Sequence, residues 1–490
     1  LGQPSLPMYK MMIKVPAGAT AEVTLHNIKT SSHSGVNLAP LQEPEYGQES
    51  NQQEIVDTEF QIDDEYYESD STYNDEPLAA VNIAHIRNQR FIEITMATAS
   101  YNPSSGEVTA LDYADVEVEV KSAGIGDTEE TLPVAESFTS IMGDATYSFI
   151  NPSLMGTPPT PEKYMIIMDD QFADNVRLGD FVNWKRRKGY DMVSVKTSEI
   201  SGGDTCTGDQ VKAYLQNLAP EDYPVYLLLI GSYDAKLGVQ QSSLETIIKG
   251  AKKGDYNLSL RDNNDLYPDL FVGRLPAINT DKLTAMLNKV MMMDINPPTE
   301  SPMYSRALFT GAQDNGIYSL ERHHPMASFY EQVDRDNDGT PDFETVRAFY
   351  SKKPIIGQQF NVYDYAPVWH GNTWIVDDNV QLVSKEVAKS LTVDTINEGA
   401  AITQYDNHGS VDGWHGFDFF RSDARALTNG DNLTFVLDSS CSTSKQFDSI
   451  GVSQENFTQV MMSNESGGAY AMFSSNKNSY PCWAFHLFFS

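Results

Sequence analysis

The first 125 residues carry the alternation of apolar and polar side chains that is typical of half-buried β-strands. The alternation is clearest at 9–15, 21–28, 90–96 and 115–120. Turn-forming sequences separate these stretches, such as Pro-Ala-Gly at 16–18 and Asn-Pro-Ser-Ser-Gly at 102–106. Several short strands with such spacing predict an all-β sandwich.

Two irregular stretches interrupt and follow the predicted sandwich. Residues 43–76 lie in a region without Lys or Arg, and they are expected to form a solvated loop, with disorder as an equal alternative. Residues 126–162 end in Gly-Thr-Pro-Pro-Thr-Pro, which predicts a stiff, exposed linker. We place the first domain boundary in this linker.

After the linker, short apolar strands alternate with amphipathic helices, which predicts parallel sheets covered by helices. The first half, 163–298, has strands expected at 164–168, 226–231 and 270–276, and helices expected at 172–188, 209–218 and 281–293. An Asn-Pro-Pro break precedes the second half, 299–490, with strands expected at 307–311, 400–405, 433–437 and 468–473. The predicted fold class is therefore multidomain, an N-terminal all-β sandwich followed by an α/β domain of two subdomains.

Charge and hydropathy argue against two classes of partner. The chain has 68 acidic and 34 basic side chains, and its net charge of -34 repels nucleic acid and anionic lipid. No apolar run reaches the roughly 18 to 20 residues that span a bilayer, so no membrane span is expected. The chain begins without a charged and apolar leader, and we expect a secreted protein whose signal peptide has already been removed.

The cysteines point to a free thiol. Three of them, Cys206, Cys441 and Cys482, are too few for a disulfide framework and lack the paired spacing of a zinc site. Cys441 follows the predicted strand 433–437, and His408 follows the predicted strand 400–405. Because adjacent parallel strands end at one edge of a sheet, these two side chains can lie close together.

A cysteine beside a histidine is the arrangement of a thiol peptidase. The imidazole takes the thiol proton, the thiolate attacks a carbonyl carbon, and the imidazolium returns a proton to the leaving amine. The backbone amides of Gly409 and Cys441 are candidates for an oxyanion hole. Each residue taken alone has a plainer interpretation, because single cysteines and histidines more often only fill a core.

Several segments, some of them around these two residues and others farther upstream, resemble the gingipain family of cysteine peptidases, which has a caspase-like fold. The lysine-specific branch of the family is the most similar. The matching segments are His408-Gly-Ser-Val-Asp-Gly-Trp, Ala426-Leu-Thr-Asn, Cys441 with Gln446-Phe-Asp, Gly468-Ala-Tyr-Ala, Trp184-Lys-Arg-Arg-Lys-Gly-Tyr and Asp269-Leu-Phe-Val-Gly-Arg-Leu-Pro. The opening, Gly2-Gln-Pro-Ser-Leu-Pro with Val15-Pro-Ala-Gly-Ala, is similar to the family's inhibitory prodomain.

The resemblance implies a zymogen with a catalytic dyad. Cys441 and His408 correspond to the dyad, and the amides of Gly409 and Cys441 to the oxyanion hole. Residues 1–125 correspond to the inhibitory prodomain. The segment 126–162 then contains the activation region.

A third catalytic residue is implied as well, because the family places a carboxylate upstream of the histidine to orient it. Glu321 is assigned to this role, and Asp314 and His323 are the alternatives within the same stretch. A charged pair on a helix surface is an equal interpretation of these residues.

The substrate pocket departs from the family pattern. Lysine-specific relatives meet the cation of the substrate with an acidic residue shortly after Asn-Ser-Tyr, but the stretch 481–486 contains no carboxylate. A preference for Lys or Arg is therefore not inherited, because a buried cation without a counter-charge is costly. Trp483 and His486, with Phe485, are expected to line an altered pocket or to pack beneath the site.

A separate acidic loop has the spacing of a calcium site. Its oxygen ligands fall at positions one, three, five, seven and nine, and Gly339 permits the tight turn between them. The predicted ligands are Asp334, Asp336, Asp338, Thr340 and Asp342. Thr345 stands where a full EF-hand loop has a bidentate Glu, so we expect a shortened loop with a structural calcium ion, or else a plain acidic turn.

The sequence is thus interpreted as a secreted cysteine endopeptidase in zymogen form, with calcium as a structural ion and no catalytic metal. Its partners are expected to be protein or peptide substrates and its own prodomain as intramolecular inhibitor. Two alternatives remain open. One is a calcium-binding adhesion or binding module on an inactive peptidase fold, and the other is a clostripain-like or legumain-like peptidase of different specificity.

Overall fold

The computed structural model describes residues 2–42, 60–87, 89–121, 132–141, 161–203, 206–232, 254–261, 265–299, 301–314, 317–334, 337, 339–351, 359–360, 374–375, 382–445 and 455–476. The chain divides into two compact units. The first comprises residues 1–163 with the segments 215–226 and 259–271, and the second comprises the remainder. The predicted domain boundaries at 125, 162 and 298 stay predictions.

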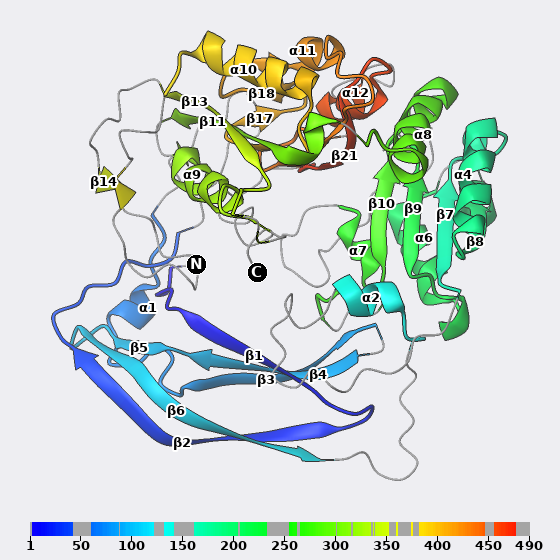
Figure 1. The fold of residues 1–490 in the computed structure, drawn as a ribbon. Helices are drawn as coiled ribbons and strands as arrows, with labels where there is room; N and C mark the ends of the chain where they lie inside the picture. Colours follow the sequence, from blue (N-terminus) through cyan, green and yellow to red (C-terminus); the bar gives the residue numbers. More distant parts are fainter. Residues whose placement is uncertain are drawn as a thin grey trace. The chain divides into compact units, whose positions relative to one another are not determined.

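The N-terminal part of the first unit is a sandwich of two antiparallel sheets, drawn in blue and cyan in Figure 1. One sheet has the order β1-β4-β3, and the other has the order β2-β6-β5. Their bounds are β1 (Met8–Lys14), β2 (Thr20–His33), β3 (Leu78–Ile86), β4 (Gln89–Ala97), β5 (Ala99–Asn102) and β6 (Glu107–Lys121). The predicted all-β front end is confirmed.

The alternation of side chains explains why the two sheets stack. Ile92, Ile94 and Met96 are buried on one face of β4, and they pack with inward side chains of β2 and β6 such as Leu25 and Val116. Two short helices that the sequence did not indicate, α1 (Asp64–Tyr67) and α2 (Glu136–Ile141), lie in the stretches expected to be irregular.

The first sheet of the α/β part has the order β10-β9-β7-β8. Its strands are β7 (Lys163–Met168), β8 (Asp191–Lys196), β9 (Tyr226–Ile230) and β10 (Phe271–Leu275). Backbone bonds from Val225 to Lys163 and from Asp169 to Ile230 show that β7 and β9 run in the same direction. The helices α4 (Val176–Arg187), α6 (Gly208–Gln216) and α8 (Thr280–Ile295) confirm the predicted strand–helix alternation.

The second sheet has the order β12-β11-β16-β20-β21, and β13 pairs with β11. Its parallel strands are β11 (Arg306–Asp314), β13 (Glu344–Ser351), β16 (Ile402–Asp406), β20 (Thr434–Asp438) and β21 (Ala469–Phe473). The edge strand β12 (Ile317–Tyr318) is antiparallel. All four strands predicted for this half are present, and β13 is an addition.

Side chains on the two faces of this sheet enter separate cores. Phe309 packs with residues of α9 (Ser319–Tyr330), whereas Leu308 and Tyr405 pack with residues of α10 (Lys385–Glu398), α11 (Arg421–Arg425) and α12 (Phe457–Ser463). A small antiparallel sheet of β17 (Gly409–Ser410), β18 (Gly413–Trp414) and β19 (Phe419–Phe420) contributes Trp414 to the second core. Parallel strands covered by helices were predicted, and the α/β fold class is confirmed. Among the described residues, no helix is long and apolar enough to cross a membrane.

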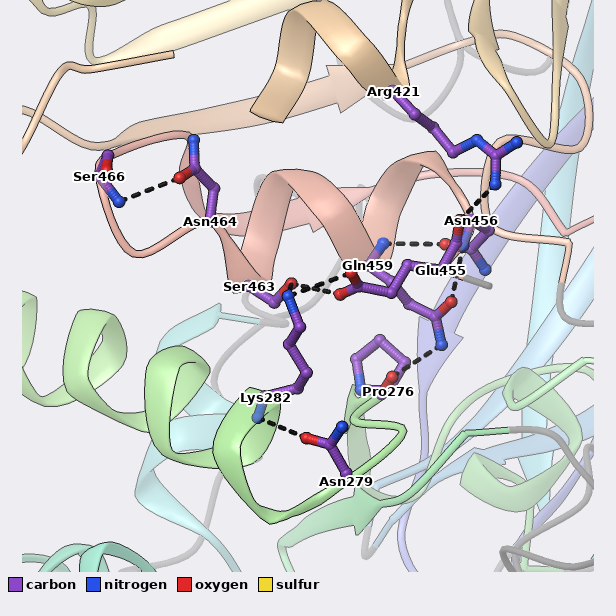
Figure 2. Close-up of polar contacts among 10 residues, drawn as sticks. All are labelled: Pro276, Asn279, Lys282, Arg421, Glu455, Asn456, Gln459, Ser463, Asn464 and Ser466. Atoms are coloured by element: carbon purple, nitrogen blue, oxygen red, sulfur yellow. Dashed lines mark hydrogen bonds and ion pairs between the residues drawn. The ribbon is translucent and has the colours of Figure 1, made fainter. Parts of the chain in front are cut away.

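The two α/β halves are joined through α12, as Figure 2 shows. The buried Gln459 side chain donates from Nε2 to the Pro276 carbonyl at 2.8 Å and to Ser232 Oγ at 3.1 Å. Its Oε1 accepts from the Asn456 backbone N–H at 2.8 Å. Nearby, Lys282 Nζ lies 3.1 Å from Glu455 Oε2. One amide side chain therefore pairs polar groups from both halves in a buried position.

Replacing Gln459 with Ala should lower the free energy of unfolding by about 2 kcal/mol, because the buried groups that it pairs lose their partner. Urea denaturation followed by intrinsic fluorescence measures this change. Gln332→Ala is the matched control, since the exposed Gln332 amide donates to the carbonyl of Ser328, four residues earlier in the chain. Equal effects of the two substitutions would contradict this role for Gln459.

Candidate active site

The proposed catalytic residues follow two neighbouring parallel strands, each three residues after a pair of residues that face each other. In the pairing of β16 with β20, Tyr405 lies opposite Asp438. His408 comes three residues after Tyr405, and Cys441 comes three residues after Asp438. Both residues therefore leave the sheet at the same edge, as expected from the sequence if the two strands are adjacent and parallel.

The backbone at Gly409 touches the turn that carries Cys441. A Cβ atom built on Gly409 would lie 3.0 Å from the Cys441 carbonyl oxygen and 2.2 Å from Ser440 Oγ. The second distance is far inside van der Waals contact, so this position has no room for a side chain. Glycine is required here for close approach, which brings the segment after His408 against the segment that contains Cys441.

Buried hydrogen bonds fix the backbone of His408. The Tyr405 hydroxyl donates to the His408 carbonyl at 2.7 Å and accepts from the Gly416 N–H at 3.0 Å. The His415 N–H donates to the same carbonyl at 2.9 Å. Tyr405 is fully buried and stacks on Trp414 with ring centroids 4.5 Å apart, and burial raises its pKa well above the ordinary value. A neutral phenol can both donate and accept, as this arrangement needs.

A buried carboxylate organises the turn on the cysteine side. Asp438 accepts from the Ser440 backbone N–H at 3.0 Å, from Ser440 Oγ at 2.6 Å and from Thr443 Oγ1 at 2.5 Å. Ser442 has a φ of +60°, a left-handed conformation that is strained for a residue other than glycine. Cys441 itself is 6% exposed, while His408 is half-buried.

The surroundings of Asp438 change its pKa. Burial raises the pKa of Asp438, and the hydrogen bonds from Ser440 and Thr443 oppose this shift without cancelling it. Burial dominates because Asp438 is only 3% exposed, and removal from water disfavours the charged form of its carboxyl group. Neither Asp438 nor Tyr405 was singled out from the sequence, although Asp438-Ser-Ser immediately before Cys441 is a turn-forming signal at a strand end.

The third catalytic residue is not decided by the described side chains. Asp314 ends β11 and Glu321 lies on α9, but their side chains are outside the described set. His323 is 1% exposed, and its ring lies 6.1 Å from Phe309 and 6.3 Å from Phe349 between centroids. His323 thus belongs to the core beneath α9. The assignment of Glu321 stays a prediction.

The expected substrate pocket lies outside the described residues. Trp483, Phe485 and His486, as well as Cys482, belong to the segment 477–490. Their predicted roles stay predictions.

The acidic loop is described in part. Asp334 Oδ2 accepts from the Gly339 N–H at 2.9 Å, and the Asp342 N–H donates to the Val333 carbonyl at 2.7 Å. Asn337 and Gly339 both have positive φ, at 57° and 85°. Asp336 and Asp338 lie outside the described residues, and the remainder form no cluster of three potential ligands. Asp334 thus contacts Gly339, and the backbone of Asp342 contacts the residue that precedes Asp334.

Comparison with known families gives the class of the protein. Residues 157–489 match the model of peptidase family C25, and residues 1–139 match the model of the propeptide of that family. The peptidase match covers more than half of the chain. The chain therefore belongs to peptidase family C25 and carries the family's propeptide, which confirms the resemblance inferred from the motifs.

Individual relatives come from Porphyromonas gingivalis. The chain is 21% identical to Lys-gingipain over 98% of its own length and 25% of the relative, and 20% identical to gingipain R2 over 90% of its length and 53% of the relative. It spans about a quarter of the Lys-gingipain chain.

Solved structures of similar proteins include the Arg-specific cysteine proteinase gingipain R. That structure has 17% identity, a TM-score of 0.49 and coverage of 67% of both chains. A complex of gingipain pro- and mature domains from Porphyromonas gingivalis has 16% identity, a TM-score of 0.49 and coverage of 66% of both chains.

Two substitutions of Asp438 separate its hydrogen bonds from its charge. Asp438→Ala removes the acceptor contacts to Ser440 and Thr443 and should lower the free energy of unfolding by about 2 kcal/mol. Asp438→Asn keeps the shape and an acceptor oxygen. Because folding raises the pKa of Asp438, the stabilisation that it contributes is complete below the unfolded pKa of about 4 and is lost as pH rises through the folded pKa.

The unfolding free energy of the unsubstituted protein should therefore fall relative to that of Asp438→Asn as pH rises from about 4 toward neutrality. Urea titrations at a series of pH values measure the difference. A constant difference over this range would show that folding does not raise the pKa of Asp438.

Proposed function

We propose that this chain is the zymogen of a cysteine endopeptidase in which Cys441 is the nucleophile and His408 its proton carrier. The observation that carries the proposal is the contact between the two strand ends, where Gly409 has no room for a side chain against Ser440 and Cys441. Membership of a peptidase family also supports the hydrolysis of peptide bonds as the reaction. The Lys-gingipain and gingipain R names of the relatives are consistent with peptide substrates.

The residues of the site suit acyl transfer to a thiol. His408 takes the proton from Cys441, and the resulting thiolate attacks the scissile carbonyl carbon. Charge then develops on the carbonyl oxygen, and the backbone N–H groups of Gly409 and Cys441 are the proposed donors to it. The imidazolium gives its proton to the leaving amine, and water hydrolyses the acyl-enzyme.

Hydrogen bonds from neighbouring residues hold the backbones of His408 and Cys441 in position. The His408 carbonyl is held by Tyr405 and His415, so the histidine backbone cannot move without breaking buried bonds. The Cys441 turn is held by Asp438 in the same way. Preorganised groups of this kind avoid the cost of reorienting during the reaction. Tyr405 and Asp438 act through the backbone and are therefore positioning residues.

The propeptide is proposed to keep the peptidase latent inside the intact chain. The matched propeptide ends at residue 139 and the peptidase match begins at 157, so cleavage between these residues, inside the predicted activation region 126–162, would break the covalent connection between the two. We propose export from the cell as the setting for this activation, in keeping with the net charge of -34 and the expected absence of nucleic-acid partners.

The residue preference of the enzyme is proposed to differ from the lysine preference of the relative named Lys-gingipain. The stretch 481–486 contains no carboxylate that could meet a cationic side chain. A substrate cation buried without a counter-charge would be strongly disfavoured.

We also propose a structural calcium ion in the loop 334–342. Asp342 bonds through its backbone to Val333, the residue before Asp334, and Asn337 and Gly339 have the positive φ values that are typical of tight turns. Carboxylate and carbonyl oxygens are the donors that calcium prefers. Asp334, Asp336, Asp338 and Asp342 would hold the ion by their side chains and Thr340 by its carbonyl, and the ion would brace the connection from α9 to β13.

Hydrolysis of a peptide library by intact and linker-cut protein tests the proposed activity. The intact chain should be latent, and the cut chain should be active once it has been freed of its propeptide. In the cut chain, Cys441→Ala and His408→Ala should each reduce turnover by at least about 10,000-fold. Gly409→Ala should be nearly as damaging, because a methyl group has no space against Ser440.

Ser410→Ala is the control for the dyad, because it lies beside Gly409 but bonds to His415. It should retain most of the activity. Full activity of the intact chain would refute latency. Absence of activity in both forms of the unsubstituted protein would favour a binding module on a peptidase fold.

Calcium at about 10 mM should raise the melting temperature by about 3 to 10 °C, given the millimolar to submillimolar affinities of extracellular calcium loops. Asp334→Asn should abolish the shift because it removes the first ligand. Asp174→Asn, at an exposed acid elsewhere, should leave the shift unchanged. Differential scanning calorimetry with EDTA as reference measures these values, and an equal shift in all three proteins would rule out this loop as the site.

A further inference from the structure

A buried arginine stands at the tip of a propeptide hairpin. Arg87 lies in the turn between β3 and β4, within the region that matches the family's propeptide, and is 5% exposed. Its backbone N–H donates to Asp269 Oδ1 at 2.7 Å, and its Nη1 donates to the Asp269 carbonyl at 2.8 Å and the Pro224 carbonyl at 3.0 Å. Pro224 and Asp269 lie in the peptidase match, and all three residues belong to the first compact unit.

The conformation of Arg87 is unusual for its residue type. Its φ is +56°, and tight hairpin turns with such a backbone normally carry Asn or Gly. Burial lowers the pKa of Arg87 to about 10, so the guanidinium is still charged at neutral pH. A strained backbone and a desolvated charge are both unfavourable, and the hydrogen bonds that this side chain makes offset them.

Apolar contacts surround the arginine. Ile86, Phe91 and Phe138 from the propeptide pack in one cluster with Val225, Tyr267 and Phe271 from the peptidase segments. The rings of Phe91 and Tyr267 meet edge-on with centroids 4.8 Å apart, and those of Phe138 and Phe271 lie 4.2 Å apart. The Arg87 guanidinium lies over the Phe138 ring at 5.8 Å from its centroid. A charged side chain with several hydrogen bonds beside a cluster of aromatic side chains is the composition of an interface hot spot.

The partner segments occur at the amino ends of strands. Residue 225 immediately precedes β9, and Asp269 comes two residues before β10. The proposed catalytic residues follow the carboxyl ends of β16 and β20, in the other sheet. Neither Pro224 nor Asp269 is therefore a residue of the proposed active site.

We propose that segments 215–226 and 259–271 form a docking site for the propeptide and that Arg87 is its anchor, so that the affinity of the cut propeptide for the peptidase depends on this side chain. The proposal rests on the proposed zymogen function. Retention of the cut propeptide then depends on a contact that is separate from the catalytic groups.

The test uses the full chain with Cys441→Ala, which prevents self-digestion, and a recognition site for a sequence-specific protease placed between residues 150 and 156. After cutting, the two fragments should co-elute in size-exclusion chromatography. Arg87→Ala should raise their dissociation constant by at least about 30-fold. Arg87→Lys keeps the charge but loses the planar fork, and it should have a smaller effect in the same direction.

Lys29→Ala is the matched control, because Lys29 is an exposed cation on the other sheet of the propeptide. It should leave the dissociation constant unchanged. Circular dichroism of each uncut protein checks folding, and Arg87→Lys carries the test if Arg87→Ala does not fold. Fragments that separate at once without substitution, or that stay equally tight when Arg87 is replaced, would overturn the proposal. The readout is co-elution, so it is independent of whether the chain hydrolyses peptides.

Discussion

The parallel pairing of β16 with β20 is the constraint on which the proposed site depends. Its register sets Tyr405 opposite Asp438, and each of these side chains is buried and hydrogen-bonded to the segment that follows its strand. A slip of one residue would turn one of the two side chains to the other face of the sheet and break those bonds. The register therefore determines both where His408 and Cys441 leave the sheet and how firmly their backbones are held.

Much of this arrangement could be predicted because it follows from local pattern. Alternating side chains indicated the sandwich, and apolar runs indicated β16 and β20, so His408 and Cys441 could be assigned to strand ends. The contributions of Tyr405 and Asp438 could not be predicted, because they arise from contacts such as that between the Tyr405 hydroxyl and Gly416. The strand β13 was missed because Glu344–Ser351 mixes charged and apolar residues, and pairing with β11 overrides that weak propensity.

The contacts of Arg87 in the propeptide could be predicted from the sequence even less. A lone Arg87 in a polar turn looks like an ordinary surface residue in the sequence, and only the fold brings Pro224 and Asp269 around it. These partners are 137 and 182 residues away along the chain. If Arg87 anchors the propeptide, the chain separates two tasks, since one set of residues performs the chemistry and another retains the propeptide. Such a division would let latency outlast the first cut without altering the catalytic groups.

Alkylation of the thiols as a function of pH tests the central claim most directly. Burial raises the pKa of Cys206 to about 11, so this thiol serves as an unreactive internal reference. In linker-cut protein freed of its propeptide, iodoacetamide should modify Cys441 rapidly at pH 6, and His408→Ala should slow that reaction by at least about tenfold, with the adduct located by mass spectrometry. Modification of Cys441 that is as slow as that of Cys206, or that is unaffected by His408→Ala, would contradict the pairing of imidazole and thiol.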